Sequence, residues 1–242
     1  ARRLAEGPTR ALAAAKARGV EIRVLIDAVG VRYSQPAITW SLRRNGIPYA
    51  LFMTNPMGIR SAYANLRSHR KILVVDGRIG FTGGMNIREN FVSTIAGDAA
   101  ANDTHFLVEG PVVAQLMAIF AHDWAFTTRE TLPLEQWIAA DWHPPEPHIA
   151  ARCIHSGPDR YMASTHSLLL GAFAVAQHHI RIQSPYFLPD QVLLGAINTA
   201  ARRGVLVDIV IPGQNNLRLV NYAMTAQLDQ VVRAGCRVWR SA

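Results

Sequence analysis

His69, Lys71 and Asn86 are the side chains of this sequence whose types and spacing most favour phosphate chemistry. They lie in the stretch HRKILVVDGRIGFTGGMN, residues 69–86. On an extended strand, His69 and Lys71 share one face and Arg70 points to the other. A neutral imidazole can attack phosphorus and form a covalent intermediate, provided that a partner holds its other ring nitrogen. An ammonium and a carboxamide can bind the phosphate oxygens. These three residue types therefore predict a phosphoryl-transfer site.

Lysine is rare in this chain, which has 25 Lys plus Arg but lysine only at Lys16 and Lys71. A lysine ammonium is a compact charge that can contact one oxygen from many directions, whereas the planar arginine fork imposes its own geometry. A phosphate ligand is thus a physical reason for lysine at position 71. A His and a Lys two positions apart would alone indicate only a surface strand. The prediction of a phosphate site therefore depends on the turn and the glycines that follow.

A β-hairpin is predicted to bring glycines beside these side chains. Asp76-Gly77 is typical of a two-residue turn in which both residues have positive φ. The predicted cross-strand pairs are Val75–Arg78, Leu73–Gly80, Lys71–Thr82 and His69–Gly84. Gly83 and Gly84 then lie at the His–Lys end, where a missing side chain lets a ligand or another backbone come close. Asn86 follows just beyond them.

Alternating strand and helix patterns around this hairpin predict an α/β fold. Strands are expected over 20–27, 47–53, 69–75, 104–110, 179–187, 205–213 and 236–241. Helices are expected over 9–18, 36–45, 111–126, 160–177, 190–203 and 216–233. The order of the elements predicts two similar αβ halves, each with a mixed sheet flanked by helices, and a second half that is incomplete.

A proline-dense stretch separates the two halves. We expect a first half over residues 1–128, a linker over 129–150 and a second half over 151–242. Residues 13–27, AAAKARGVEIRVLID, match residues 198–212, NTAARRGVLVDIVIP. Each of these segments is followed by a helix, a glycine and a further strand, which indicates an internal duplication, although αβ units resemble one another in any case.

The composition is that of a globular chain, with 50% hydrophobic residues, a formal net charge of +8 and a pI near 10.2. Positive charge favours anionic partners such as nucleic acid, acidic lipid surfaces or phosphorylated small molecules, without choosing among them. Cys153 and Cys236 fit no metal-ligand spacing and are expected to be free thiols. No apolar stretch reaches the roughly 18–20 residues of a membrane span.

The stretch resembles the signature H-x-K-x4-D-x6-G-G-x-N of the phospholipase D superfamily. The match includes every fixed position of that signature: His69, Lys71, Asp76, Gly83, Gly84 and Asn86. The surroundings are similar to those of bacterial cardiolipin synthases. The matching segments are RGVEIRVLIDAVG, GFTGGMNI, DTHFLVEGPVVAQL and SPYFLPD, at residues 18–30, 80–87, 103–116 and 184–190.

This resemblance implies a role for each position. His69 would be the nucleophile, and Lys71 and Asn86 would bind phosphate oxygens. Asp76 belongs to the signature, but the hairpin places it in the turn, seven residues from His69, so we expect it to fix the turn. Asp103 opens the strand after the motif and would hold the nucleophilic imidazole in its tautomer. The resemblance implies no cofactor and no metal, although His143, Glu146 and His148 could in principle ligate one.

The chain departs from the two-motif members of this family because it contains one H-x-K motif. In those members a second histidine protonates the leaving alcohol and deprotonates the incoming one. A missing C-terminal part or a second subunit would supply it. The second half keeps the run-up to another motif, so we expect the natural chain to extend beyond both ends.

The expected function is a phosphatidyltransferase that makes cardiolipin from two phosphatidylglycerol molecules through a phosphohistidine. The expected setting is a membrane surface, at the cytoplasmic side of a bacterial inner membrane. The alternatives are a phosphodiester hydrolase, either phospholipase D or a dimeric endonuclease acting on nucleic acid, and a non-catalytic basic binding module.

Overall fold

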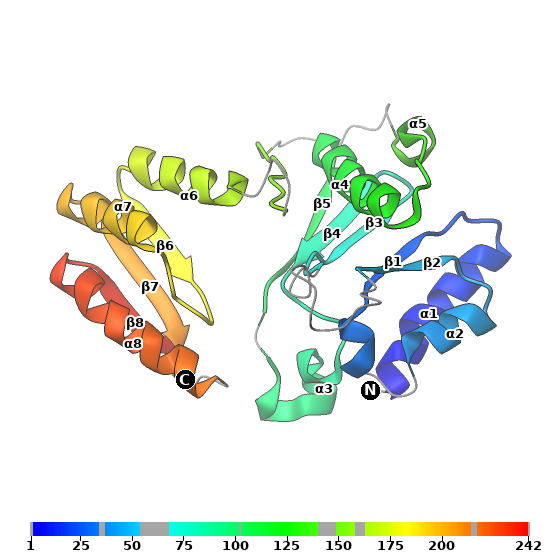
Figure 1. Cartoon of the computed structure of the whole chain (residues 1–242), viewed down its shortest axis with the longest axis horizontal. Coiled ribbons are helices and arrows are strands. Elements are labelled where there is room, and N and C mark those ends of the chain that lie inside the picture. Colours follow the sequence, from blue (N-terminus) through cyan, green and yellow to red (C-terminus); the bar gives the residue numbers. More distant parts are fainter. Residues whose placement is uncertain are drawn as a thin grey trace. The chain divides into compact units, whose positions relative to one another are not determined.

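A computed structural model describes residues 2–33, 37–53, 68–101, 103–139, 149–157, 163–213 and 217–241 (Figure 1). The chain forms two compact units, Ala1–Cys153 and Ile154–Ala242. Each unit is described by itself below. His143, Glu146 and His148 lie outside the described residues.

Unit 1 begins with a parallel strand pair packed against two helices. Its elements are α1 (Arg2–Ala17), β1 (Val24–Asp27), α2 (Ile38–Arg44) and β2 (Tyr49–Phe52), with a 3-10 turn, Gly30–Tyr33, after β1. Alternate residues of β1 face opposite sides, so Val24 and Ile26 pack with the buried Ile22, Leu42 and Ile47. Apolar burial on this side fixes the strand pair to α1 and α2.

The second part of unit 1 is an antiparallel sheet with the order β3-β4-β5. Its strands are β3 (Ile72–Val75), β4 (Ile79–Gly83) and β5 (His105–Glu109). The helices after β5 are α4 (Pro111–Thr128) and α5 (Leu134–Trp137), and short turns Glu89–Phe91, Ser93–Ala96 (α3) and Gly97–Ala99 lie between β4 and β5. Gly80 lets α4 approach, because a Cβ there would lie 2.7 Å from Cδ1 of Leu116.

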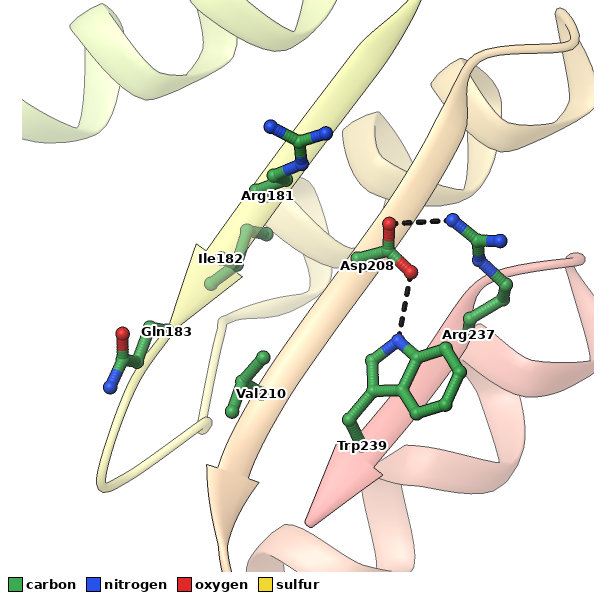
Figure 2. Close-up of a pocket in the computed structure, with 7 residues that line it drawn as sticks. All are labelled: Arg181, Ile182, Gln183, Asp208, Val210, Arg237 and Trp239. Carbon is green, nitrogen blue, oxygen red and sulfur yellow. Dashed lines mark hydrogen bonds and ion pairs between the residues drawn. The ribbon is translucent and has the colours of Figure 1, made fainter. Parts of the chain in front are cut away.

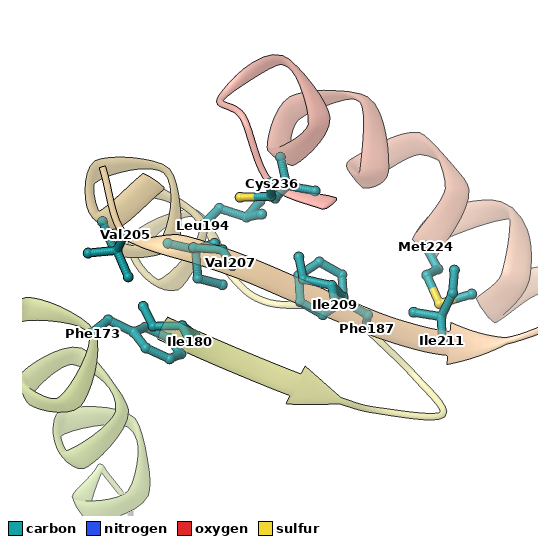
Figure 3. Close-up of a cluster of buried hydrophobic side chains, with 13 residues drawn as sticks. Phe173, Ile180, Phe187, Leu194, Val205, Val207, Ile209, Ile211, Met224 and Cys236 are labelled. Atoms are coloured by element: carbon teal, nitrogen blue, oxygen red, sulfur yellow. The ribbon is translucent and has the colours of Figure 1, made fainter. Parts of the chain in front are cut away.

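Unit 2 is a parallel sheet with the order β6-β7-β8. Its elements are α6 (Ser164–Val175), β6 (His179–Gln183), α7 (Gln191–Arg202), β7 (Leu206–Pro212), α8 (Arg218–Arg233) and β8 (Arg237–Ser241). Figure 3 shows its core, in which Val207, Ile209 and Ile211 of β7 pack with Leu194 of α7 and Met224 of α8. The intervening residues of β7 point to the opposite face.

The predicted α/β architecture is found, but parallel and antiparallel pairing occupy different sheets. We expected a mixed sheet in each half. Unit 1 instead has a parallel pair and an antiparallel three-stranded sheet, and the described strands of unit 2 are all parallel. Residues 129–139, at the start of the expected linker, contain α5, and Leu132 is buried against α4.

The predicted hairpin register was wrong by one residue. The ladder pairs Val75 with Ile79 and Ile72 with Thr82, whereas a two-residue turn would pair Val75 with Arg78. Asp76 and Gly77 do adopt positive φ, 53° and 63°, as their types predicted. Arg78 donates its N–H to the Val75 carbonyl at 3.1 Å but forms no ladder pair, so it acts as an extra residue that shifts β4 along β3.

Strand register supports the internal duplication. Val24 lies opposite Tyr49 in β1–β2, and Ile209 lies opposite Val238 in β7–β8. The glycine that ends the preceding helix gives a common reference point. Val24 and Ile209 lie at equal distances after Gly19 and Gly204. Tyr49 and Val238 likewise lie at equal distances after Gly46 and Gly235. The four glycines also end their helices alike, because the residue after each donates back to a helical carbonyl at 2.9–3.2 Å.

Candidate active site

His69 and Lys71 lie in the extended segment that leads into β3. Neither belongs to the strand itself, which begins at Ile72. His69 is exposed and Lys71 is half-buried, and the Lys71 ammonium donates to the His69 carbonyl at 2.7 Å. The ammonium is thereby held next to the backbone that carries the imidazole. The two side chains thus lie at one end of β3, accessible to a ligand.

Arg70, between them, joins this segment to α4. Its Nη1 donates to Oδ1 of Asp123 at 2.6 Å and also to Oδ2 of the same carboxylate. Asp123 is a buried residue of α4, 6% exposed, and His122 Nδ1 lies 3.6 Å from its Oδ1. A charge-assisted pair of this kind is shorter and stronger than a neutral hydrogen bond. It orients the short segment that holds His69 and Lys71.

Gly83 and Gly84 let the chain before β5 approach the end of β4. The Gly84 N–H donates to the Thr104 carbonyl at 3.2 Å. A Cβ at Gly84 would lie 2.7 Å from Oδ2 of Asp103, and one at Gly83 would lie 2.6 Å from Nδ1 of His105. The close approach that the two glycines predicted is therefore made by the protein's own Asp103–His105 segment.

Asp103 is brought next to the glycine pair, although it is 19 residues away along the chain. Its side chain is exposed, and Oδ1 accepts a hydrogen bond from the Thr104 N–H at 2.7 Å. A Cβ at Gly84 would meet both oxygens of this carboxylate, Oδ1 more closely than Oδ2. The carboxylate is thereby held against the glycine pair, where it can accept a hydrogen bond from an N–H donor.

Asp76 and Asn86 flank the hairpin differently. Asp76 lies in the turn with φ of 53°, at the end of β3 farthest from Lys71. Asn86 is half-buried and follows Gly84 by two residues, and its carbonyl accepts the Arg88 N–H at 2.9 Å. The structure therefore brings Asn86 to the glycine end of the hairpin and leaves Asp76 at the other end.

His105 is a residue of this site that the sequence reasoning did not select. It pairs with Gly83 across β4–β5, and its Nδ1 is buried with no hydrogen-bond partner among the described residues. The signal that could have identified it is its position two residues after Asp103, on the first residue of β5. It places a second imidazole beside the glycine pair.

In the described part of the chain, no group of three or more His, Cys, Asp or Glu side chains is arranged to hold a metal ion. None of the helices described is both long and apolar enough to cross a membrane.

The fold and this site define an α/β domain of the phospholipase D-like class. Residues 6–124 and 169–241 match the family described as "Cardiolipin synthase, PLD-like domain". The chain belongs to this family.

Curated relatives carry the name Cardiolipin synthase A. The protein of that name from Pseudomonas fluorescens (strain SBW25) is 36% identical over 224 residues, which cover 93% of this chain and 46% of the relative. The one from Pseudomonas putida (strain GB-1) is 35% identical over the same shares of the two chains. The chain thus spans about half the length of the curated relatives it matches.

Solved structures share the fold at low sequence identity. A phosphatidylserine synthase from Haemophilus influenzae Rd KW20 gives a TM-score of 0.57 at 15% identity, covering 91% of this chain and 60% of that one. A polyphosphate kinase from Porphyromonas gingivalis gives 0.52 at 14% identity, covering 95% and 33%. These likenesses concern the fold alone.

Proposed function

We propose that the protein containing this chain is a phosphatidyltransferase that makes cardiolipin from two molecules of phosphatidylglycerol. The observation that carries the proposal is the His69–Lys71 segment beside the Gly84–Asp103 contact, in a chain that belongs to the PLD-like cardiolipin synthase family. The names of the relatives supply the substrate class.

In the first step, a ring nitrogen of neutral His69 attacks the phosphorus of one phosphatidylglycerol. A P–N bond forms and the P–O bond to the glycerol headgroup breaks, so glycerol leaves with a proton from a general acid. Lys71 and Asn86 bind the phosphoryl oxygens, and the glycines leave room for the close approach of Asp103. Asp103 accepts a hydrogen bond from the other ring N–H of His69 and so fixes the tautomer of the nucleophile.

In the second step, a hydroxyl of another phosphatidylglycerol attacks the same phosphorus. Its proton passes to the base that acted as acid in the first step, the P–N bond breaks, and His69 is released neutral with cardiolipin as product. That acid and base is a second motif histidine, supplied by a further part of the protein or by a second subunit. Asp76 supports the motif through the turn.

The proposed setting is a membrane surface, at the cytoplasmic side of a bacterial inner membrane. The net charge of +8 supports it, because anionic lipids attract a basic protein over about a Debye length. Neither a metal nor a cofactor takes part in the proposed steps, so activity is expected to survive excess chelator.

The test uses the complete protein and vesicles of phosphatidylglycerol, with lipids separated by thin-layer chromatography. Cardiolipin and glycerol are expected as products, and a rapid detergent quench at mildly alkaline pH, where the P–N bond survives, is expected to trap a phosphohistidine. His69→Ala should lower turnover by several powers of ten, and Lys71→Arg should also impair it because the fork misplaces its donors. The matched control is His178→Ala, at an exposed histidine of unit 2.

Three results would contradict the proposal. Phosphatidic acid as the main product would indicate a hydrolase, and cleavage of single- or double-stranded DNA in a parallel assay would indicate a nuclease. His69→Ala with activity within tenfold of the wild type would remove the nucleophile from the mechanism.

A further inference from the structure

The sheet of unit 2 carries a hollow whose carboxylate is already paired within the protein (Figure 2). Asp208 accepts hydrogen bonds there from Arg237 Nη2 at 2.6 Å and from Trp239 Nε1 at 2.8 Å. Unit 1 differs, because the imidazole of His105 lies beside the glycine pair with a buried Nδ1 that has no hydrogen-bond partner among the described residues. A buried polar atom without a partner costs stability, so His105 is a side chain whose presence the packing alone does not explain.

Strand pairing places His105 and Lys71 on the same face of the β3-β4-β5 sheet. Ile72 and Phe106 both pair with Thr82, and directly paired residues share a face. Lys71 comes just before Ile72 in an extended segment and therefore points to the opposite face. His105 comes just before Phe106 on β5 and points to that opposite face as well.

The Arg70–Asp123 pair agrees with this orientation. Asp123 belongs to α4, so Arg70 points toward that helix. The residues on either side of Arg70 in the extended segment, His69 and Lys71, then point away from α4. The sheet face opposite α4 therefore carries two imidazoles, those of His69 and His105, together with the ammonium of Lys71.

Gly83 lies between Lys71 and His105. It pairs with His105 across β4–β5, and it follows Thr82, the partner of Ile72, by one residue, which puts it level with Lys71. Neighbouring strands lie about 4.8 Å apart, so the Cα atoms of Lys71 and His105 are about 10 Å apart. A glycine adds no third side chain between the ammonium and the imidazole. Side chains of these lengths can then contact one phosphate group from two sides.

The burial of Nδ1 decides which ring nitrogen of His105 can donate a hydrogen bond. A Cβ at Gly83 would lie 2.6 Å from Nδ1, so the edge of the ring that carries Nδ1 is packed against β4. A proton on Nδ1 would bury an N–H that has no acceptor among the described residues, whereas a proton on Nε2 leaves only an acceptor unpaired. The neutral imidazole therefore carries its proton on Nε2, the nitrogen farther from the backbone.

We propose that His105 binds the phosphate of the lipid substrate by donating its Nε2–H to a phosphoryl oxygen, from the side opposite Lys71. The inference rests on the proposed function, because its ligand is the phosphodiester of phosphatidylglycerol. The donor contacts a phosphoryl oxygen both before and during the reaction, so it contributes to substrate binding more than to the chemical step. In this it differs from Asp103, which acts on the nucleophile.

The test compares three substitutions of His105 in the complete protein, with thermal melts as the check on folding. Glutamine places an amide N–H close to the position of Nε2, asparagine places one close to that of Nδ1, and leucine has a similar volume without a donor. Isothermal titration calorimetry measures the dissociation constant of inorganic phosphate. Assays with short-chain phosphatidylglycerol in detergent micelles measure KM and kcat. The matched control is His179→Leu, because His179 is the exposed first residue of β6, as His105 is the first of β5.

His105→Leu and His105→Asn should weaken phosphate binding about tenfold, which is the effect of losing one hydrogen bond to an anion. They should raise KM by a similar factor with kcat nearly unchanged, because the contact is made in the ground state and in the transition state. His105→Gln should stay within about threefold of the wild type. Lys71→Met should also weaken phosphate binding, which assigns the bound phosphate to this site, and the control should bind as the wild type does.

Wild-type phosphate affinity and KM in a folded His105→Leu protein would overturn the inference, as would His105→Gln binding as weakly as His105→Leu. A lower kcat at unchanged KM would show that His105 orients the nucleophile instead, and would overturn the binding role. If the variants do not fold, the wild type with ¹⁵N-labelled histidine decides. Saturating phosphate should shift the Nε2 resonance of His105, and an unshifted resonance would contradict the inference.

These outcomes are separate from those that test the proposed function. Phosphate binding requires no turnover, so phosphatidic acid as the main product would change the reaction and leave the His105 contact in place. Phosphate affinity that does not depend on His105 would, in turn, leave the assignment of His69 intact.

Discussion

Arg70 and Asp123 tie the segment that carries His69 and Lys71 to helix α4. The guanidinium binds both oxygens of a carboxylate that is 6% exposed, and it does so from the residue between the two proposed site residues. The position of the proposed nucleophile, His69, therefore depends on the Arg70–Asp123 pair.

Asp123→Asn is expected to lower the free energy of unfolding by about 2 kcal/mol, because it leaves the Arg70 charge without its carboxylate. It should also lower kcat in the complete protein, since the His69–Lys71 segment loses its anchor. Urea denaturation and turnover measure the two effects. The control is Asp229→Asn, which removes the exposed Asp229–Arg233 pair of α8 and should cost under about 0.5 kcal/mol. Equal losses in the two variants would show that the buried pair has no special role.

Gly84→Ala should displace Asp103, because the new Cβ would lie 2.7 Å from its Oδ2. We expect at least a tenfold loss of kcat from a misplaced carboxylate, with a smaller effect on KM. Gly195→Ala in α7 is the matched control, since a Cβ there meets no atom within 4 Å and alanine favours a helix by up to about 1 kcal/mol. Unchanged turnover in Gly84→Ala would mean that Asp103 does not need its position beside the glycine.

Two substitutions at Asp76 distinguish a structural role in the turn from a role of its carboxylate in the reaction. Its φ of 53° lies in the left-handed region, which asparagine tolerates and valine does not. Asp76→Asn should therefore keep both stability and turnover, whereas Asp76→Val should lower the free energy of unfolding by about 1–2 kcal/mol. Thermal melts and product assays of both variants provide the measurements. A stable Asp76→Asn protein without activity would assign the carboxylate itself to the reaction.

Glu130 should make stability depend on acid pH. Hydrogen bonds from Arg23 and then from Trp124 lower its pKa below the ordinary value of 4.5. A carboxyl whose folded pKa is depressed contributes stability that is present above the unfolded pKa and is lost as pH falls through the folded one. The urea midpoint of the wild type should thus exceed that of Glu130→Gln at pH 7, and the gap should close in acid below pH 4.5. A gap that stays constant over this range would remove the ionised carboxylate as its cause.

Local residue types were enough to predict most helices and strands. They predicted the ends of these elements and the pairing of the strands less well. Asp76 and Gly77 adopt the positive φ values that their residue types favour. Arg78, however, forms no ladder pair and so shifts the strand register by one residue. Nothing in the residue types distinguishes a turn with such an extra residue from one without it. Similarly, α1 continues through Pro8, which the sequence suggested would lie before the helix.

The sequence predicted which residues of the motif would lie near one another, but it did not predict the contacts that hold them in place. The spacing of the motif brings His69, Lys71, Gly84 and Asn86 to the same end of the hairpin. The Asp103–Gly84 contact joins the start of β5 to the end of β4 across 19 residues of sequence, and the Arg70–Asp123 pair joins the segment before β3 to helix α4. Such contacts depend on how the elements pack, so sequence spacing alone could not give them.

Three of the four equivalent helix ends allow the same substitution to be compared at different places in the chain. At Gly19, Gly204 and Gly235 the φ values are 89°, 92° and 100°, and an added Cβ would meet no atom within 4 Å. Alanine at each of these positions therefore imposes the same backbone penalty without a steric one. Equal losses at Gly204 and Gly235 with a different loss at Gly19 then report that the two units unfold separately, whereas three equal losses report that they unfold together.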